Sequence, residues 1–480
     1  VAELNAQQQH AVDVIFRARD YALVHGMPGT GKSRLLAAVL QIAALRGLSV
    51  LFCSHTHQAI DNVLLRLPHQ QHAAHGTPRC DGISGAEHAQ NCVRLLRLGR
   101  PSQVDAQLHY ATLMPGEFCS VAALSRRVHD ANVVATTCFG MAHAAIERRG
   151  AFDLVLVDEA SQISEPAALG AILRAARAFV LVGDHLQLAP LVRNALNRTS
   201  MNGMNSGETL NELEKSEPST SLFERLCVAH PQAVIKLGVQ YRMAEEIMQL
   251  SNVLVYNGEL QCANESVRAR HIAINATWES EQSRALRTAL DPARKVVFLD
   301  TDSCGTAARE RRDDTEATGG GSAAIRHDVD ATQRTNPGES NLVRHVVSAL
   351  VTHGVAPAEM VVLSPYRAQV ALISDALRST TSTSSVSALT VDRAQGLDRA
   401  CVVVSMVRSN AQQRVGVLLR DARRLNVALT RAQAKLILVG SASTLRAGSA
   451  VLRKLLDCLH ARDAVCSVDA AHMFEPPSSL

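Results

Sequence analysis

Short apolar runs alternate with longer stretches of helical hydrophobic periodicity along most of the chain. In the first half these runs cover residues 22–24, 50–52, 133–135, 154–157 and 179–182. They are continuous rather than alternating, which is typical of strands buried on both faces of a parallel sheet and separated by helices. The pattern predicts an α/β domain.

The second half repeats this pattern, with runs at residues 234–237, 296–299, 360–363, 402–407 and 436–439. We therefore expect two tandem α/β domains, residues 1–235 and 236–480. The boundary is placed just before the segment Val239-Gln240-Tyr241-Arg242-Met243.

Four segments interrupt the pattern, at residues 68–92, 199–221, 303–336 and 379–385. They are rich in His, Gly, Ser, Thr, Asn or charge, and few of their side chains repay the entropy of ordering. We expect surface loops. The first contains four His and two Cys, but its composition favours a loop over a zinc site.

A phosphate-binding motif follows the first apolar run. It reads Gly26-Met27-Pro28-Gly29-Thr30-Gly31-Lys32-Ser33 and opens a predicted helix at residues 33–45. Its glycines let backbone N–H groups turn toward phosphate oxygens. Lys32 is expected to reach the outer phosphates of ATP, and the Ser33 hydroxyl to bind Mg²⁺. The alternative, a glycine-rich turn that happens to carry lysine, does not explain the strand before it and the helix after it.

Polar side chains follow two further predicted strands. Asp158 and Glu159 come directly after residues 154–157, where Asp158 is expected to hold Mg²⁺ and Glu159 to polarise the attacking water. An acidic helix N-cap is the alternative for such a pair. Gln187 follows residues 179–182 and is a candidate sensor of the γ-phosphate.

Composition restricts the remaining possibilities only modestly. Lys and Arg number 49 against 45 Asp and Glu, so the net charge of +4 neither requires nor excludes a nucleic acid. Aromatic residues are only 3% of the chain, so a site that stacks every base on a ring is not expected. The 11 scattered cysteines indicate a reducing compartment. No apolar run reaches the length of a membrane span, and no membrane association is expected.

Seven segments together carry a family resemblance, at residues 24–32, 54–62, 134–138, 157–164, 183–188, 239–243 and 424–432. In this order they resemble the motifs of superfamily-one helicases of 5′→3′ polarity. Within that superfamily the chain looks most like the helicase half of the eukaryotic DNA replication ATP-dependent helicase/nuclease family. The resemblance implies two RecA-like domains, with ATP between them and single-stranded DNA across both.

The resemblance also implies roles for residues that no local pattern singles out. Gln8 is expected to read adenine, and Glu339 to contact the ribose side of the nucleotide. Arg242 and Arg431 are expected to reach the γ-phosphate. Gly396 lies in the segment 391–398, which is expected to couple nucleotide to nucleic acid.

The expected strand contacts are Thr56, Thr137, Pro365, Tyr366 and Thr390. Ala394 and Leu397 stand where the family usually has an aromatic residue and often has Arg, so coupling is expected to be weaker. An isolated Arg431 would favour a salt bridge on a helix surface, and this alternative carries more weight for the neighbouring Arg420, Arg423 and Arg424.

The implied activity is Mg²⁺-dependent ATP hydrolysis that drives translocation and unwinding of DNA. The implied partners are single-stranded or flapped DNA and a single-strand-binding protein. The implied location is the nucleus, with the mitochondrion as a second site. Nuclease activity is not expected from these residues. Two alternatives stay open: an RNA helicase of the nonsense-mediated-decay type, and a nucleotide-switched binding module that hydrolyses ATP slowly.

Overall fold

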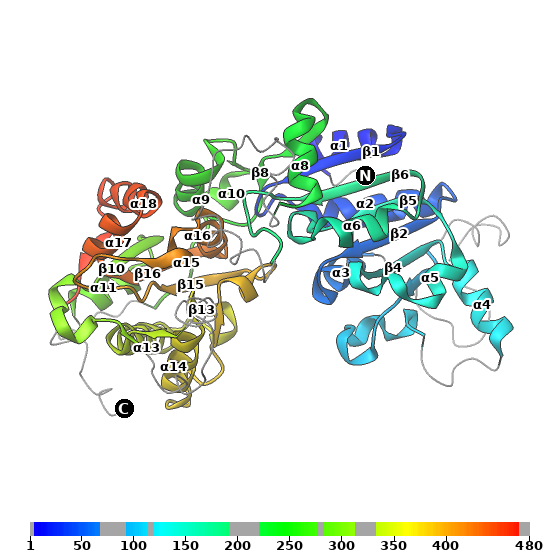
Figure 1. Ribbon diagram of the computed structural model, residues 1–480. Coiled ribbons are helices and arrows are strands. Elements are labelled where there is room, and N and C mark those ends of the chain that lie inside the picture. Colours follow the sequence, from blue (N-terminus) through cyan, green and yellow to red (C-terminus); the bar gives the residue numbers. More distant parts are fainter. Residues whose placement is uncertain are drawn as a thin grey trace, which may run out of the picture. The chain divides into compact units, whose positions relative to one another are not determined.

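The computed structural model describes residues 4–67, 93–113, 120–191, 220–275, 283–312 and 333–469. The chain forms two compact units (Figure 1). The first contains Val1–His185 and Ala189–Val239, and the second contains Leu186–Leu188 and Gln240–Leu480.

A seven-stranded sheet forms the centre of the first unit, in the order β3-β4-β2-β5-β6-β1-β7, and every pairing in it is parallel. The strands are β1 (Tyr21–Gly26), β2 (Val50–Ser54), β3 (Leu95–Arg97), β4 (Val133–Thr137), β5 (Phe152–Val157), β6 (Ala175–Gly183) and β7 (Val234–Leu237). The described helices are α1 (Ala6–Arg17), α2 (Lys32–Leu45), α3 (His57–Leu64), α4 (Val121–Asp130), α5 (Ala144–Arg149), α6 (Glu165–Ile172) and α8 (Leu222–Ala229).

Successive side chains of β1 point to opposite faces of this sheet, and both faces are covered. Val24 packs in a core with residues of α1, α2 and α3, such as Leu36. The neighbouring Leu23 packs in a second core with residues of α4, α5, α6 and α8, such as Phe223. Burial on both faces explains why the strands read as continuous apolar runs.

The second unit contains a six-stranded sheet in the order β14-β13-β15-β16-β10-β17, again with every pairing parallel. Its strands are β10 (Val296–Asp300), β13 (Met360–Ser364), β14 (Ser387–Thr390), β15 (Arg399–Ser405), β16 (Ala432–Gly440) and β17 (Val465–Ser467). The described helices are α9 (Glu245–Ser251), α10 (Glu265–Arg268), α11 (Arg284–Leu290), α13 (Pro337–Thr352), α14 (Arg367–Arg378), α15 (Gly416–Arg420), α16 (Ala422–Leu429), α17 (Ala442–Gly448) and α18 (Ala450–His460).

One face of this second sheet packs on α11, α13 and α14 through residues such as Val297 and Val403. The alternate positions, such as Phe298 and Val404, are buried as well. Two short strand pairs lie outside the large sheets: β8 (Val239–Gln240) with β9 (Gln261–Cys262), and β11 (Arg311–Arg312) with β12 (Arg334–Thr335). None of the described helices is both long and apolar enough to cross a membrane.

The α/β fold with parallel sheets flanked by helices is confirmed, and it has the RecA-like P-loop form that was expected. One strand was assigned to the wrong half. Residues 234–237 form β7, which pairs with β1 in the first sheet. The predicted domain boundary, between residues 235 and 236, falls inside this strand.

One predicted loop is partly wrong, one is confirmed as a largely exposed turn segment, and two others lie wholly or largely outside the described residues. Segment 303–336 contributes most of a 3-10 helix, Asp302–Ala308, and both strands of the β11–β12 pair. Segment 379–385 contains Thr383, which is fully buried and donates from Oγ1 to the carbonyl oxygen of Leu377 at 2.7 Å. Segment 68–92, with its His and Cys residues, and residues 199–219 are not among the described residues.

Candidate nucleotide and nucleic-acid sites

The loop between β1 and α2 has the backbone of a phosphate cradle. Gly29 and Gly31 have φ of +74° and +79°, a conformation that side chains rarely adopt. A Cβ on Gly26 would lie 2.5 Å from the Lys32 side chain, and one on Gly31 would lie 2.7 Å from Nε2 of Gln8. At Gly31 both the conformation and the space favour glycine, whereas at Gly29 the conformation does so and at Gly26 the close approach of the Lys32 side chain does so.

Lys32 begins α2 and turns back over this loop. Its Nζ donates to the carbonyl oxygen of Gly26 at 2.7 Å, so the ammonium lies against the loop. No side chain caps the N-terminus of α2. The positive end of the helix and the Lys32 charge together favour an anion at this point. These residues fit the phosphates of a nucleotide.

Gln8 connects helix α1 to the same loop. Its Nε2 donates to the carbonyl oxygen of Thr30 at 3.0 Å, and its Oε1 accepts from the backbone of Asn5 at 3.1 Å. Asn5 in turn accepts from the Gln8 backbone, which completes a capping box. Gln8 is 2% exposed and holds the loop in place. Its expected reading of adenine stays a prediction.

Asp158 and Glu159 follow β5 with very different surroundings. Burial and the neighbouring Glu159 carboxylate raise the pKa of Asp158 to about 7, while Lys32 opposes that shift. Glu159 has φ of +51°, a strained conformation for a residue other than glycine, and it accepts from Nε2 of Gln162 at 3.0 Å. The two carboxylates interact electrostatically across this strained turn, and Asp158 also lies within electrostatic reach of Lys32.

The end of β6 packs tightly on the segment after Glu159. A Cβ on Gly183 would lie 2.9 Å from the backbone nitrogen of Ser161. Asp184 is buried and bonds to Nε2 of His25 at 3.0 Å, which ties the end of β6 to the last residues of β1. The strand ends that carry the phosphate loop and the carboxylates are therefore held together inside the first unit.

The two predicted arginines meet around Thr430 in the second unit. Arg242 forms an ion pair with Asp398 at 3.0 Å and donates to the Thr430 carbonyl oxygen at 3.3 Å. Arg431 is 2% exposed and donates to Oγ1 of Thr430 at 3.0 Å. Its Nη2 also lies 3.4 Å from Oε1 of Gln187, whose short segment groups with this unit. Both side chains thus contact Thr430, and their expected reach to the γ-phosphate stays a prediction.

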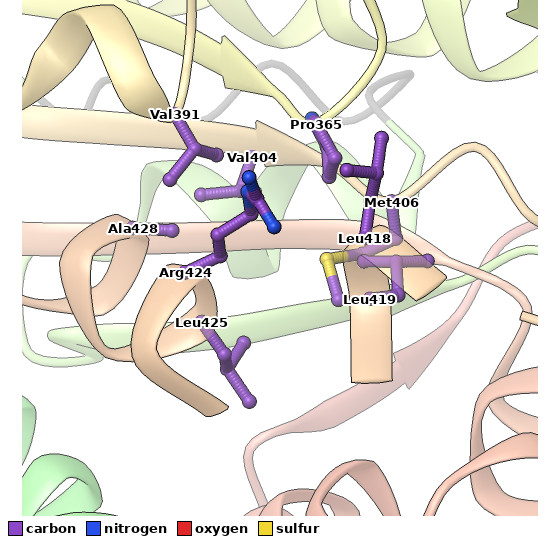
Figure 2. Close-up of a pocket in the computed structure, with 9 residues that line it drawn as sticks. All are labelled: Pro365, Val391, Val404, Met406, Leu418, Leu419, Arg424, Leu425 and Ala428. Atoms are coloured by element: carbon purple, nitrogen blue, oxygen red, sulfur yellow. The ribbon is translucent and has the colours of Figure 1, made fainter. Parts of the chain in front are cut away.

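Arg424 forms salt bridges, which is the alternative role considered for it from the sequence. It forms ion pairs with Asp392 and Asp421, both at 3.0 Å. Figure 2 shows its side chain in a small pocket whose other lining residues are all apolar, among them Val391 and Val404. The aliphatic part of Arg424 is thus packed while its guanidinium is paired.

Glu339 lies deep inside the second unit. It is in the first turn of α13, is fully buried, and accepts from Oγ of Ser405 at 2.7 Å and from the backbone of Val407 at 2.9 Å. Burial raises the pKa of Glu339 to about 7. The carboxylate supports Val407, whose φ of +70° is strained. The expected contact with a ribose stays a prediction. In the structure, Glu339 forms hydrogen bonds with residues inside the second unit.

The residues of the second unit that are expected to contact the nucleic acid differ in exposure. Tyr366 is 1% exposed, and its hydroxyl donates to the carbonyl oxygen of Val415 at 3.2 Å, so its ring supports the unit from inside. Pro365 directly follows strand β13, Thr390 ends the neighbouring strand β14, and both residues are partly exposed. Gly396, in the expected coupling segment, has φ of +83°.

The residues of the first unit that are expected to contact the nucleic acid lie where the β-strands of its sheet end. Ser54 and Thr137 are opposite each other at the ends of β2 and β4. Thr56 is exposed and caps α3, accepting from the backbone of Ala59 at 3.2 Å. Because parallel strands end at the same edge, these residues share it with the phosphate loop and with Asp158.

A buried ion pair beneath α3 was missed from the sequence. Arg97 is fully buried, and its Nε lies 2.8 Å from Oδ1 of Asp61. Its Nη2 also lies 3.0 Å from Nδ1 of His57, so the helix that begins after Thr56 is tied to β3. The only signal was an arginine at the end of a short apolar run.

Family models and similar proteins match most of the chain. Two models described as AAA domain match residues 218–443, and residues 3–115 with 120–195. The chain is 38% identical over 457 residues to the DNA replication ATP-dependent helicase/nuclease DNA2 of Xenopus laevis, covering 92% of this chain and 38% of that protein. For the protein of that name in Saccharomyces cerevisiae the identity is 35%, covering 92% of this chain and 26% of that protein.

The chain thus spans well under half the length of these relatives. Among solved structures, the Arterivirus nonstructural protein 10 helicase matches with a TM-score of 0.38 and 14% identity, covering 90% of this chain and 61% of that one.

Proposed function

Because the chain belongs to the superfamily-one helicases, in the group of the DNA replication ATP-dependent helicase/nucleases, we propose that it hydrolyses ATP to move 5′→3′ along single-stranded DNA and to unwind duplex. One observation carries this proposal: the phosphate loop, Asp158 and Glu159 lie at the sheet edge that also bears Thr56 and Thr137. Nucleotide chemistry and strand binding are thus built on the ends of neighbouring strands.

Different residues of the chain bind the phosphates, activate the water and offer ligands for Mg²⁺. Amides of the loop and the Lys32 ammonium hold the phosphates, and Glu159 orients and polarises the attacking water. Ser33 and Asp158 offer the hard oxygen ligands that suit Mg²⁺, and the buried Asp158 beside Lys32 fits such a site. When bound, the cation neutralises charge on the phosphates.

Arg242, Arg431 and Gln187 are the proposed γ-phosphate contacts of the second unit. A guanidinium that reaches the γ-phosphate stabilises charge in the transition state and is worth about 10³–10⁵ in rate in related enzymes. Because Arg431 lies within hydrogen-bond distance of Gln187, we expect a bound nucleotide to affect both residues. That response would convert hydrolysis into a step along the strand.

The family resemblance supplies the finer parts of the proposal, and the relatives' names contribute only DNA replication and a helicase/nuclease activity. The substrate is single-stranded or flapped DNA, with a single-strand-binding protein as a partner and the nucleus as the location, with the mitochondrion second. The nuclease named in those relatives is not part of this proposal, which concerns ATP hydrolysis and movement along the strand.

Two substrates and two tail polarities test this function. ATP turnover is measured with single-stranded DNA and with RNA of equal length, and unwinding is measured on duplexes with a 5′ or a 3′ tail. We expect stimulation by DNA and unwinding only from the 5′ tail. Stronger stimulation by RNA would favour the RNA helicase, and turnover without any unwinding would favour the nucleotide-switched module.

A further inference from the structure

Phe139 is the most exposed aromatic side chain in the described part of the chain. It is 70% exposed, whereas Tyr110 and Tyr241 are 41% and 37% exposed. Leaving a phenylalanine in water forgoes about 1.5–3 kcal/mol of burial. Neither ATP nor the phosphate contacts of a strand require an apolar ring at this position.

The local backbone holds this ring outward. Phe139 lies in the 3-10 helix Cys138–Ala142, in which residues three apart share a face. Cys138 and Met141 are buried on that face, at 4% and 9% exposure, which leaves Phe139 on the other side. A Cβ on Gly140 would lie 2.3 Å from Oγ1 of Thr136, so the turn sits directly on the end of β4.

A second ring lies beside it at the same sheet edge. His55 follows β2, and its imidazole approaches Phe139 with centroids 6.2 Å apart and planes at 65°. This edgewise geometry leaves the phenyl ring largely open. Burial lowers the pKa of His55, against the opposing effect of the Glu159 carboxylate, so the imidazole adds an uncharged surface.

The residues near Phe139 indicate which ligand its ring would contact. Thr56 and Thr137, on the same two strand ends, are the proposed contacts for the sugar-phosphate backbone. A strand held there places its bases within reach of the next side chains along each loop. Base stacking on one aromatic ring contributes about 1–3 kcal/mol and tolerates any sequence.

We infer that Phe139, with His55 at its edge, forms a stacking platform for one nucleobase of the bound strand. The inference rests on the proposed function and adds a specific contact to it. His55, at the edge of this platform, also lies within electrostatic reach of Glu159. A single ring of this kind agrees with a chain in which only 3% of residues are aromatic.

The test compares oligonucleotides with and without bases. Wild type, Phe139→Ala, Phe139→Leu and Phe139→Trp are titrated with oligo(dT) and with an abasic oligonucleotide of the same length and charge, using fluorescence anisotropy. We expect Phe139→Ala and Phe139→Leu to bind oligo(dT) about 5- to 100-fold more weakly and abasic DNA as wild type does, while Phe139→Trp binds both normally. Stacking on 2-aminopurine should quench its fluorescence, and Phe139→Ala should remove that quenching.

Three outcomes would overturn the inference. If Phe139→Ala bound both oligonucleotides like wild type, the ring would serve another occupant, such as a protein partner. If it lost affinity for both equally, the ring would act on the phosphate contacts or the fold. If Phe139→Leu restored full affinity, apolar area rather than stacking would matter. A wild type that bound neither oligonucleotide would instead contradict the proposed function itself.

Discussion

Lys32 and Glu159 act on different parts of ATP turnover, and this separates binding from hydrolysis. Lys32→Ala removes the charge that lies against the phosphate loop, so ATP affinity and turnover should both be lost. Glu159→Gln keeps the size and the local hydrogen bond to Gln162 but removes the charge that polarises water, so ATP should bind normally without turnover. Binding is measured with a fluorescent ATP analogue, and turnover by phosphate release. Near-normal turnover in Glu159→Gln would show that another group is the base.

Glu339 should make the second unit respond to pH. Its folded pKa of about 7 exceeds the ordinary value of 4.5, so the folded state holds its proton more tightly than the unfolded state. The stability that results is fully present below pH 4.5 and is lost as pH rises to about 7, by at most about 3 kcal/mol. Glu339→Gln, which cannot ionise, should escape this loss.

Urea unfolding between pH 4.5 and 8 measures this difference. The stability of Glu339→Gln relative to wild type should rise with pH, whereas the exposed Glu359→Gln should parallel wild type throughout. Parallel curves for Glu339→Gln would mean that the buried carboxyl ionises as in water. An unchanged ATP affinity in the same variant would assign Glu339 to structure alone, and a weakened affinity would support the contact with ribose.

Among single residues, the sequence predicted positions and conformations that depend on local spacing, while the roles of these residues stay predictions. The glycines of the phosphate loop and the carboxylates after β5 follow from spacing on strand ends. The burial of Tyr366 and Glu339 was not predictable, because it depends on residues 415 and 405–407, which are distant in sequence. An exposed ring such as Phe139 gives no sequence signal distinct from a core phenylalanine.

At the scale of elements, the contact between α3 and β3 depends on one buried charge pair. Arg97→Ala would leave Asp61 buried without its cation, and we expect a loss of about 3–5 kcal/mol of unfolding free energy. The double variant Arg97→Met with Asp61→Leu removes both charges and should lose much less. Arg225→Ala, which breaks a pair with half its arginine side chain exposed, should lose less than about 1 kcal/mol.

A double-mutant cycle by chemical unfolding measures this coupling. Additive losses would show that Arg97 and Asp61 act independently. If the Arg97→Ala variant stays folded, it should also bind single-stranded DNA more weakly, because Thr56 caps the helix that the pair anchors.

Strands with a continuous apolar run were predicted, and three short strands were missed. Strands β3, β14 and β17 have three or four residues, too few for a hydrophobic period, and β3 carries the buried Arg97. Strand β7 was assigned to the second half because sequence order alone does not show that it pairs with β1. Pairing across more than 200 residues is decided by the sheet as a whole.

At the scale of the whole molecule, Arg431 tests whether the second unit takes part in ATP hydrolysis. Arg431→Ala is expected to cut turnover about 10³-fold or more with little change in ATP affinity, since the contact strengthens in the transition state. Arg431→Lys should also be slow, because an ammonium lacks the planar fork of donors. Arg424→Ala, in the same segment, should turn over ATP nearly as wild type does.

Thermal melting of each variant controls for folding, because Arg431 is buried and donates to several oxygens of its own unit. A folded Arg431→Ala that loses only ATP affinity would make this arginine a binding residue. Equal losses in Arg424→Ala and Arg431→Ala would place the effect in the segment rather than in one guanidinium.

The central claim is that a bound strand controls ATP hydrolysis at the phosphate loop, and steady-state ATP turnover with and without single-stranded DNA tests it most directly. The account predicts slow turnover alone, marked stimulation as the DNA concentration rises, and no stimulated turnover in Glu159→Gln. Turnover that is indifferent to DNA, or stimulation that survives in Glu159→Gln, would contradict it.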